Sequence, residues 1–245
     1  MHTFLTEVRE TLAPGRTARF GPLPPLLVAM TVVTGLVDAF SYLLLGHVFV
    51  ANMTGNVVFL GFAVAGAQGF SITASLVALA SFGAGSVVGG RVAQRFGHHR
   101  GHHLAVATWT QSLLLAVSVV LALVGRHPFG AGVRYALIVV LALAMGVQNS
   151  SVRRLAVPDL TTTVLTLTVT GIGADSVLGG GKGSKSGRRL ISIAAMFIGA
   201  LAGAALILHV HVGLALIVAL AIVLGVATVS HWSGRSNPAW THADD

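Results

Sequence analysis

The sequence predicts an all-α membrane protein with about six transmembrane helices and two short re-entrant or broken segments. The first observation behind this is composition: of 245 residues, 54% are apolar and 9% are charged, and the mean hydropathy is +0.85. Soluble domains carry roughly 25% charged residues, because they need polar side chains to cover their surface. In lipid the shortage is an advantage, since a charge at the bilayer centre costs about 2.5–3.5 kcal/mol.

The second observation is a series of apolar runs. A spanning helix needs about 20 apolar residues. Six runs reach this length, at residues 23–45, 71–90, 104–125, 133–151, 190–209 and 212–230. The apolar part of a signal peptide is only about 7–15 residues long, so we expect the first run to remain as a membrane anchor.

Two further runs are irregular. Run 47–67 is interrupted by Asn52-Met53-Thr54-Gly55-Asn56, and run 160–177 is rich in threonine and follows Pro158-Asp159. Polar and glycine-rich interruptions of this kind are typical of segments that do not form one continuous spanning helix. We therefore expect both to be short or broken membrane segments.

The third observation is the distribution of the 15 Lys and Arg residues. If all eight runs crossed the membrane, 10 of these Lys and Arg residues would lie on the side of the N-terminus. If each irregular run instead returns to the side from which it entered, 13 of the 15 lie on the side of the N-terminus, and only Arg126 and Arg134 lie on the opposite side. Cytoplasmic loops carry an excess of Lys and Arg. The second arrangement is therefore preferred, and it predicts a multi-pass protein of the bacterial inner membrane with both termini cytoplasmic.

The chain also repeats itself. Gly35-Leu36-Val37-Asp38 aligns with Gly146-Val147-Gln148-Asn149, 111 residues later, and Gly85-x-x-x-Gly89 aligns with Gly199-x-x-x-Gly203, 114 residues later. Each half then contains three spans and one irregular segment. An odd number of spans makes the two halves inverted relative to one another, an arrangement common in transporters.

These observations divide the chain into one membrane domain and two short tails. The transmembrane domain is expected at 23–231, with repeat halves at about 23–125 and 132–230. Residues 1–22 are expected to form a cytoplasmic N-terminal tail, and 232–245 a C-terminal tail.

Several motifs resemble those of the YoaK-like family of bacterial integral membrane proteins, a domain of unknown function. They are Gly35-x-x-Asp38-Ala39-x-Ser41-Tyr42, Phe49-x-Ala51-Asn52-Met53-Thr54-Gly55-Asn56, Gly146-x-Gln148-Asn149, Arg153-Arg154 and Thr162-Thr163. The resemblance covers roughly residues 25–230. It implies a membrane location and about six spans, and it supplies no substrate.

Asp38 is the only acidic residue inside a predicted spanning helix. Carboxylates within the membrane are costly and usually face a cavity or a partner. Asp38 is therefore a candidate proton or cation site, and the alternative is a hydrogen-bonded residue at a helix contact. Its counterpart in the second half is Asn149, next to Gln148.

The Asn52–Asn56 block is the second candidate. If a helix begins near Thr54, its free N–H groups point into the membrane interior, and Asn52 or Thr54 is expected to cap it. The alternative is a tight turn between two helices. The threonines at 161–163 are expected to play the mirrored role, unless their hydroxyl groups only bond to their own helix.

Together these residues predict a small-solute transporter or permease, coupled to protons or cations, that works by alternating access between inverted halves. The candidate substrate- or ion-binding residues are Asp38, Asn52, Thr54, Asn56, Gln148, Asn149 and Thr163. The first alternative is a structural or partner-binding membrane protein. The second is an intramembrane enzyme, which is disfavoured because the spans lack a nucleophile–base pair or a second carboxylate.

Other classes of site are not expected. There is no cysteine, which excludes disulfides and thiolate metal sites. The histidines in 98–103 lie among arginines, which favours a hydrophilic turn over a metal site. Lys182-Gly183 departs from the phosphate-loop pattern, so 179–186 is read as a basic linker. No cofactor or metal is therefore predicted.

The expected partners are the lipid bilayer and an unknown small solute. Nucleic acid is not expected, because the basic residues lie in short clusters between apolar runs. The pairs Gly85/Gly89 and Gly199/Gly203 are small-residue motifs that let helices approach closely. They are expected to pack helices within one protomer or between protomers of a homo-oligomer.

Overall fold

The computed structural model describes residues 2–15, 18–163, 165–175, 180, 186–235 and 239–242. Within these ranges the chain is helical, and six helices are long and apolar enough to cross a membrane. They are α2 (Leu23–Leu44), α4 (Ile72–Phe96), α5 (Arg100–Val124), α6 (Ala131–Leu155), α8 (Ser186–His209) and α9 (Leu214–Gly234). The predicted all-α membrane class and the six spans are confirmed. Most of the proposed basic linker at 179–186 lies outside the described residues.

Local sequence explains where these helices begin. Pro24 and Pro25 lie in the first turn of α2, where a proline removes no intrahelical hydrogen bond. Ser71 caps α4 by accepting a hydrogen bond from the N–H of Ala74 at 3.2 Å. His99 caps α5 in the same way, accepting from the N–H of His102 at 3.0 Å. The histidines at 98–103 therefore include a helix cap.

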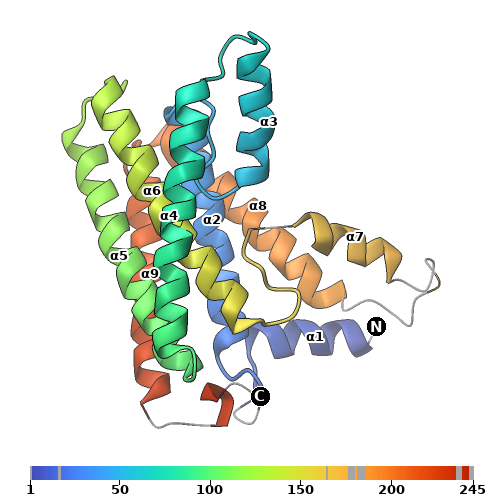
Figure 1. Ribbon diagram of the computed structural model, residues 1–245. Helices are drawn as coiled ribbons and strands as arrows, with labels where there is room; N and C mark the ends of the chain where they lie inside the picture. The colour runs from blue at the N-terminus through green and yellow to red at the C-terminus, as the bar shows by residue number, and fades with distance from the viewer. Residues whose placement is uncertain are drawn as a thin grey trace.

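The two irregular runs form hairpins that enter and leave at the same end. In each, an extended stretch is followed by a short helix, α3 (Met53–Val64) or α7 (Thr166–Ala174). Helices of 12 and 9 residues are about 18 and 14 Å long, too short for a hydrocarbon core of roughly 30 Å. The two sides of the first hairpin meet again where Nδ1 of His47 lies 3.1 Å from the carbonyl oxygen of Gly69. In Figure 1, α3 starts at mid-height and rises to the end where α2 finishes.

Equivalent helix pairs from the two halves pack in equivalent ways. Helix α8 packs on α2, and α4 packs on α6 (Figure 1). Gly35 of α2 faces the backbone of α8 at Gly199, and Gly146 of α6 faces the backbone of α4 at Gly85. Each half therefore places its second long helix on the first long helix of the other half, as expected for an inverted repeat.

The glycine pairs of α4 and α8 are used inside the protomer. A Cβ atom on Gly85 would lie 2.2 Å from the carbonyl oxygen of Leu143, and one on Gly199 would lie 2.2 Å from that of Val32. Gly89 and Gly203 face α6 and α2 in the same manner. The glycine-bearing faces of α4 and α8 therefore pack against helices of the same protomer.

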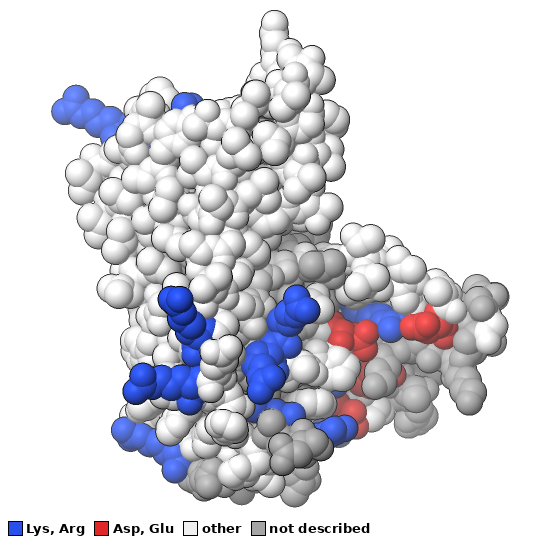
Figure 2. Space-filling view, in the orientation of Figure 1, with Lys and Arg blue, Asp and Glu red and all other residues white. Residues whose placement is uncertain are grey.

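Charge is segregated between the ends of the bundle. Arg126 and Arg134 lie at the end away from the termini, and the other described arginines lie at the end that carries both termini (Figures 1 and 2). The asymmetry is the one that the sequence predicted for a chain with two re-entrant segments.

The two terminal segments are more ordered than the predicted tails. Helix α1 (His2–Leu12) lies across the end of the bundle (Figure 1). Glu7 fastens it to the start of α8 by accepting a hydrogen bond from the N–H of Gly187 at 3.0 Å. At the other terminus, α9 extends to Gly234, and Trp240 in the short helix η2 (Ala239–Thr241) is buried against Gly21. Burial of the Trp240 side chain stabilises the packing of η2 against Gly21.

Candidate functional site

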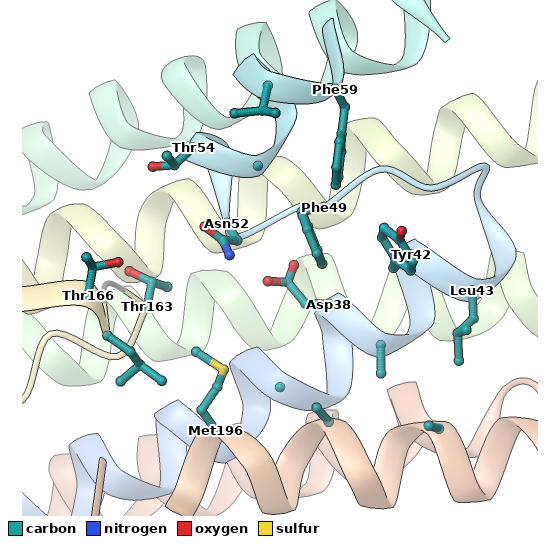
Figure 3. A pocket seen from close by; sticks show the side chains of 17 residues that line it. Asp38, Tyr42, Leu43, Phe49, Asn52, Thr54, Phe59, Thr163, Thr166 and Met196 are labelled. Carbon is teal, nitrogen blue, oxygen red and sulfur yellow. The ribbon is translucent and has the colours of Figure 1, made fainter. Parts of the chain in front are cut away.

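A cavity with several polar side chains lies where the first hairpin meets the second. It has a volume of about 690 Å³ and lies between α2, α3, α8 and the residues that lead into α7 (Figure 3). We call it the first cavity. Its lining includes Asp38, Tyr42, Phe49, Asn52, Thr54, Phe59, Thr163, Thr166 and Met196. Four of the seven predicted site residues, Asp38, Asn52, Thr54 and Thr163, therefore meet here.

Asp38 holds the descending segment of the first hairpin, the extended stretch that contains Val50 and Ala51 and leads into α3. Its side chain lies in the last third of α2 and is 8% exposed. Oδ1 accepts hydrogen bonds from the backbone N–H groups of Val50 at 3.1 Å and Ala51 at 2.9 Å. In a membrane such extended backbone needs a partner, because lipid offers none. Within the described chain, no basic side chain forms an ion pair with Asp38.

Asn56 supports the same segment from α3. Its Oδ1 accepts from the N–H of Phe49 at 2.9 Å, and its Nδ2 donates to the carbonyl oxygen of Phe49 at 2.6 Å. The side chain is fully buried and does not line the cavity. Asn56 therefore positions the hairpin instead of facing a solute.

The start of α3 differs from the prediction in its cap. The helix begins at Met53, and Asn52 occupies the N-cap position without a capping hydrogen bond from its side chain. The side chains of Asn52 and Thr54 are exposed to the cavity instead. Both polar groups are thus available to a solute at the N-terminus of α3.

Aromatic rings form one wall of the first cavity, and the sequence motifs did not predict them. Tyr42 stacks on Phe49 with ring centroids 5.0 Å apart, and Phe49 stacks on Phe59 at 5.6 Å. Phe59 also stacks on Phe70 at 5.1 Å. A local concentration of aromatic residues could have indicated this wall: only 13 residues in the chain are Phe or Tyr, and these four lie within 42–70.

The second half contains a matching but smaller cavity of about 460 Å³ between α4, α6 and the segment before α7. We call it the second cavity. Asn149 takes the place of Asp38, and its Oδ1 accepts a hydrogen bond from the hydroxyl group of Thr163. Arg153 takes the place of Tyr42 at the repeat-equivalent position. Thr163 lines both cavities and so lies between them.

Gln148 lies in the core and outside both cavities. Its Nε2 is 2.9 Å from the hydroxyl oxygen of Thr34 and 3.3 Å from that of Thr162. Its Oε1 accepts from Nε2 of Gln111 at 2.6 Å. This buried network joins α2, α5, α6 and the second hairpin, so Gln148 positions the hairpin.

Arg189 anchors the second hairpin at its two ends. Its Nε is 3.0 Å from Oδ1 of Asp159, before the hairpin, and a terminal nitrogen is 2.8 Å from Oδ2 of Asp175, after α7. The guanidinium group also packs against Gly171, where a Cβ atom would lie 2.5 Å away. One arginine therefore holds both ends of this hairpin against α8.

Comparison with known proteins identifies the family. The family described as "Protein of unknown function (DUF1275)" matches residues 26–229. The chain is 31% identical over 145 residues to the "UPF0700 transmembrane protein YoaK" of Bacillus subtilis (strain 168), a match that spans 59% of this chain and 63% of that protein. No solved structure matches. The chain therefore belongs to this family of multi-pass membrane proteins of unknown function.

Proposed function

We propose that this protein is a small-solute transporter whose binding site is the first cavity. The observation that carries the proposal is the meeting of two half-helix N-termini, α3 and α7, with a buried carboxylate in a cavity of about 690 Å³. Small-molecule sites commonly have volumes of roughly 300–1,000 Å³. Broken helices that meet near the midplane between inverted repeats are a recurrent design for such sites.

The pair of cavities supports an alternating-access cycle. The first cavity is lined by the last turns of α2 and the start of α3, and the second by the last turns of α6 and the segment that follows it. Thr163 separates them. Rocking one half against the other would close one cavity and open the other to the solute. Asp38, as the charged residue of the first cavity, would couple this movement to a proton or another cation.

The charge distribution supports an orientation with both termini in the cytoplasm of a bacterial cell. Basic residues gather at the end with the termini (Figure 2), and such residues face the cytoplasm in most bacterial membrane proteins.

This topology predicts that single cysteines at His47 and Gln68 both react from outside the cell. The two positions flank the first hairpin, and the absence of cysteine removes any background. A membrane-impermeant maleimide on intact cells measures this. Gln94→Cys, near the other end of α4, serves as the control and is expected to react only after permeabilisation. Reaction of His47→Cys and Gln68→Cys from opposite sides would show that α3 belongs to a through-going span.

The transport proposal predicts solute-driven proton movement that depends on Asp38. Purified protein is reconstituted in liposomes with an internal pH dye, and a panel of small cationic, neutral and anionic solutes is added outside. We expect at least one solute to change the internal pH and Asp38→Asn to reduce that rate by about tenfold or more, because a neutral amide cannot carry the proton.

Glu10→Gln on α1 is the matched control, since it removes a carboxyl group that lines neither cavity. Its rate should equal that of the wild type. Equal rates for Asp38→Asn and the wild type would remove Asp38 from coupling. Absence of flux for the whole panel would count against a transporter and favour a structural or partner-binding role.

A further inference from the structure

We propose that the first cavity selects an organic cation: a small amine that carries an apolar or aromatic group. The inference rests on the proposed function, because it names the class of solute that this site would accept. Three features of the cavity lead to it: its charge, its aromatic wall and its contrast with the second cavity.

The first cavity contains an acidic group for which the described chain supplies no counter-charge. Among the described residues of its lining, Asp38 is the only acidic or basic one, and no basic side chain of the described chain pairs with it. A buried carboxylate without a counter-charge is costly. A cationic solute would supply the missing charge at the moment of binding.

The aromatic wall suits the same class of solute. Tyr42, Phe49 and Phe59 line the cavity and form a continuous stack. Figure 3 shows the ring of Phe49 next to the carboxylate of Asp38. The face of an aromatic ring attracts organic cations, and it also packs well against apolar carbon. A solute held between Asp38 and Phe49 would use both interactions.

The second cavity has no carboxylate at the corresponding position. At the repeat-equivalent position Asn149, a neutral amide, holds the second hairpin through Thr163. An amide oxygen could accept the N–H bonds of Val50 and Ala51 equally well, so a carboxylate at Asp38 exceeds the structural requirement. At the next equivalent position, Arg153 replaces Tyr42, which makes the second cavity positive. The two cavities therefore share a framework and differ in the charge they would accept.

The test is binding of three matched probes to the detergent-purified protein, measured by titration calorimetry. Benzylamine (a cation at neutral pH), benzyl alcohol and benzoate share one ring and differ in charge. We expect saturable binding of benzylamine and about 30-fold weaker or no binding of the other two, in line with the loss of one partner of a buried charge pair.

Variants assign the binding to this cavity. Asp38→Asn should weaken benzylamine binding by about 30-fold, and Phe49→Leu by about three- to tenfold. Phe62→Leu is the matched control for the aromatic wall, because Phe62 lies on α3 outside the cavity lining. This variant should bind benzylamine with the same affinity as the wild type. Because the three probes are compared on the wild-type protein, the test does not depend on whether Asp38→Asn folds.

The outcomes separate this inference from the transport proposal. Preferential binding of benzoate or benzyl alcohol, or benzylamine affinity unchanged in Asp38→Asn, would overturn the cation assignment even if solute flux is found in liposomes. Selective, Asp38-dependent benzylamine binding would support the cation site even if no flux occurs, and would then leave a binding protein instead of a transporter.

Discussion

Replacement of Gly146 by valine is expected to cause a large loss of stability. A Cβ atom at this position would lie 2.2 Å from the carbonyl oxygen of Phe82 and 2.8 Å from the N–H nitrogen of Ser86. Both are backbone atoms, so only separation of α4 from α6 can relieve the clash. We expect a cost of about 3 kcal/mol or more, which corresponds to a fall in Tm of roughly 6–12 °C for a chain of this size.

Size-exclusion chromatography of heated, detergent-purified protein measures the change. Gly199→Val should behave in the same way, since its Cβ would meet the carbonyl oxygen of Val32 at 2.2 Å in the repeat-equivalent pair α2–α8. Gly83 and Gly90 of α4 provide the controls, because a Cβ atom on either has no neighbour within 4 Å. Alanine at these two positions should leave the Tm unchanged or raise it. A Gly146→Val protein as stable as the wild type would contradict the close α4–α6 contact.

Asp38→Ala is expected to release the descending segment of the first hairpin, whereas Asp38→Asn should retain it. Alanine leaves the N–H groups of Val50 and Ala51 without their acceptor. Each buried N–H without a partner costs about 1–3 kcal/mol, so we expect a loss of about 2–6 kcal/mol in the alanine variant. Asparagine keeps an oxygen at the Oδ1 position and should unfold within a few degrees of the wild type.

Asn149→Ala is the matched control in the other half. It removes the hydrogen bond from the hydroxyl group of Thr163 and a local bond from Nδ2 of Asn149 to the carbonyl oxygen of Met145, one turn earlier in α6. A threonine hydroxyl can turn back to its own backbone, and the Met145 carbonyl belongs to the helix interior. We therefore expect a cost near 1 kcal/mol, measured by the same thermal assay. If Asp38→Ala were no more destabilising than Asn149→Ala, the two backbone bonds to Asp38 would not be what holds the hairpin.

Much of the architecture followed from simple properties of the chain. The six spans were predictable because a bilayer of defined thickness demands apolar runs of a defined length. The hairpins were predictable from the positions of Arg126 and Arg134 relative to all other basic residues. The correspondence of Asp38 with Asn149 was predictable from the repeat, and the structure places each on a long helix, α2 or α6, with its side chain bonded to the extended stretch of the hairpin that follows.

The side chains that face the first cavity were harder to predict. Asn56 and Gln148 belong to the same polar motifs as Asn52 and Asn149, yet both turn away from the cavities and hold backbone or core groups. The aromatic wall was missed because Tyr42, Phe49 and Phe59 are separated along the chain and only the hairpin brings their rings together. The helix α1 was missed because its residues are polar on average.

By itself, then, the sequence determined the membrane class, the number of spans, the inverted repeat and the presence of a carboxylate within the membrane. The tertiary structure decided which polar groups meet: Asp38 with the backbone at 50–51, Gln148 with Gln111 and Thr34, and Thr163 between two cavities. The physical reason is that lipid removes the usual guide to orientation. In water an apolar stripe marks the buried face of a helix, but in a bilayer the lipid-facing and protein-facing sides are both apolar, so small residues and hydrogen bonds choose the face.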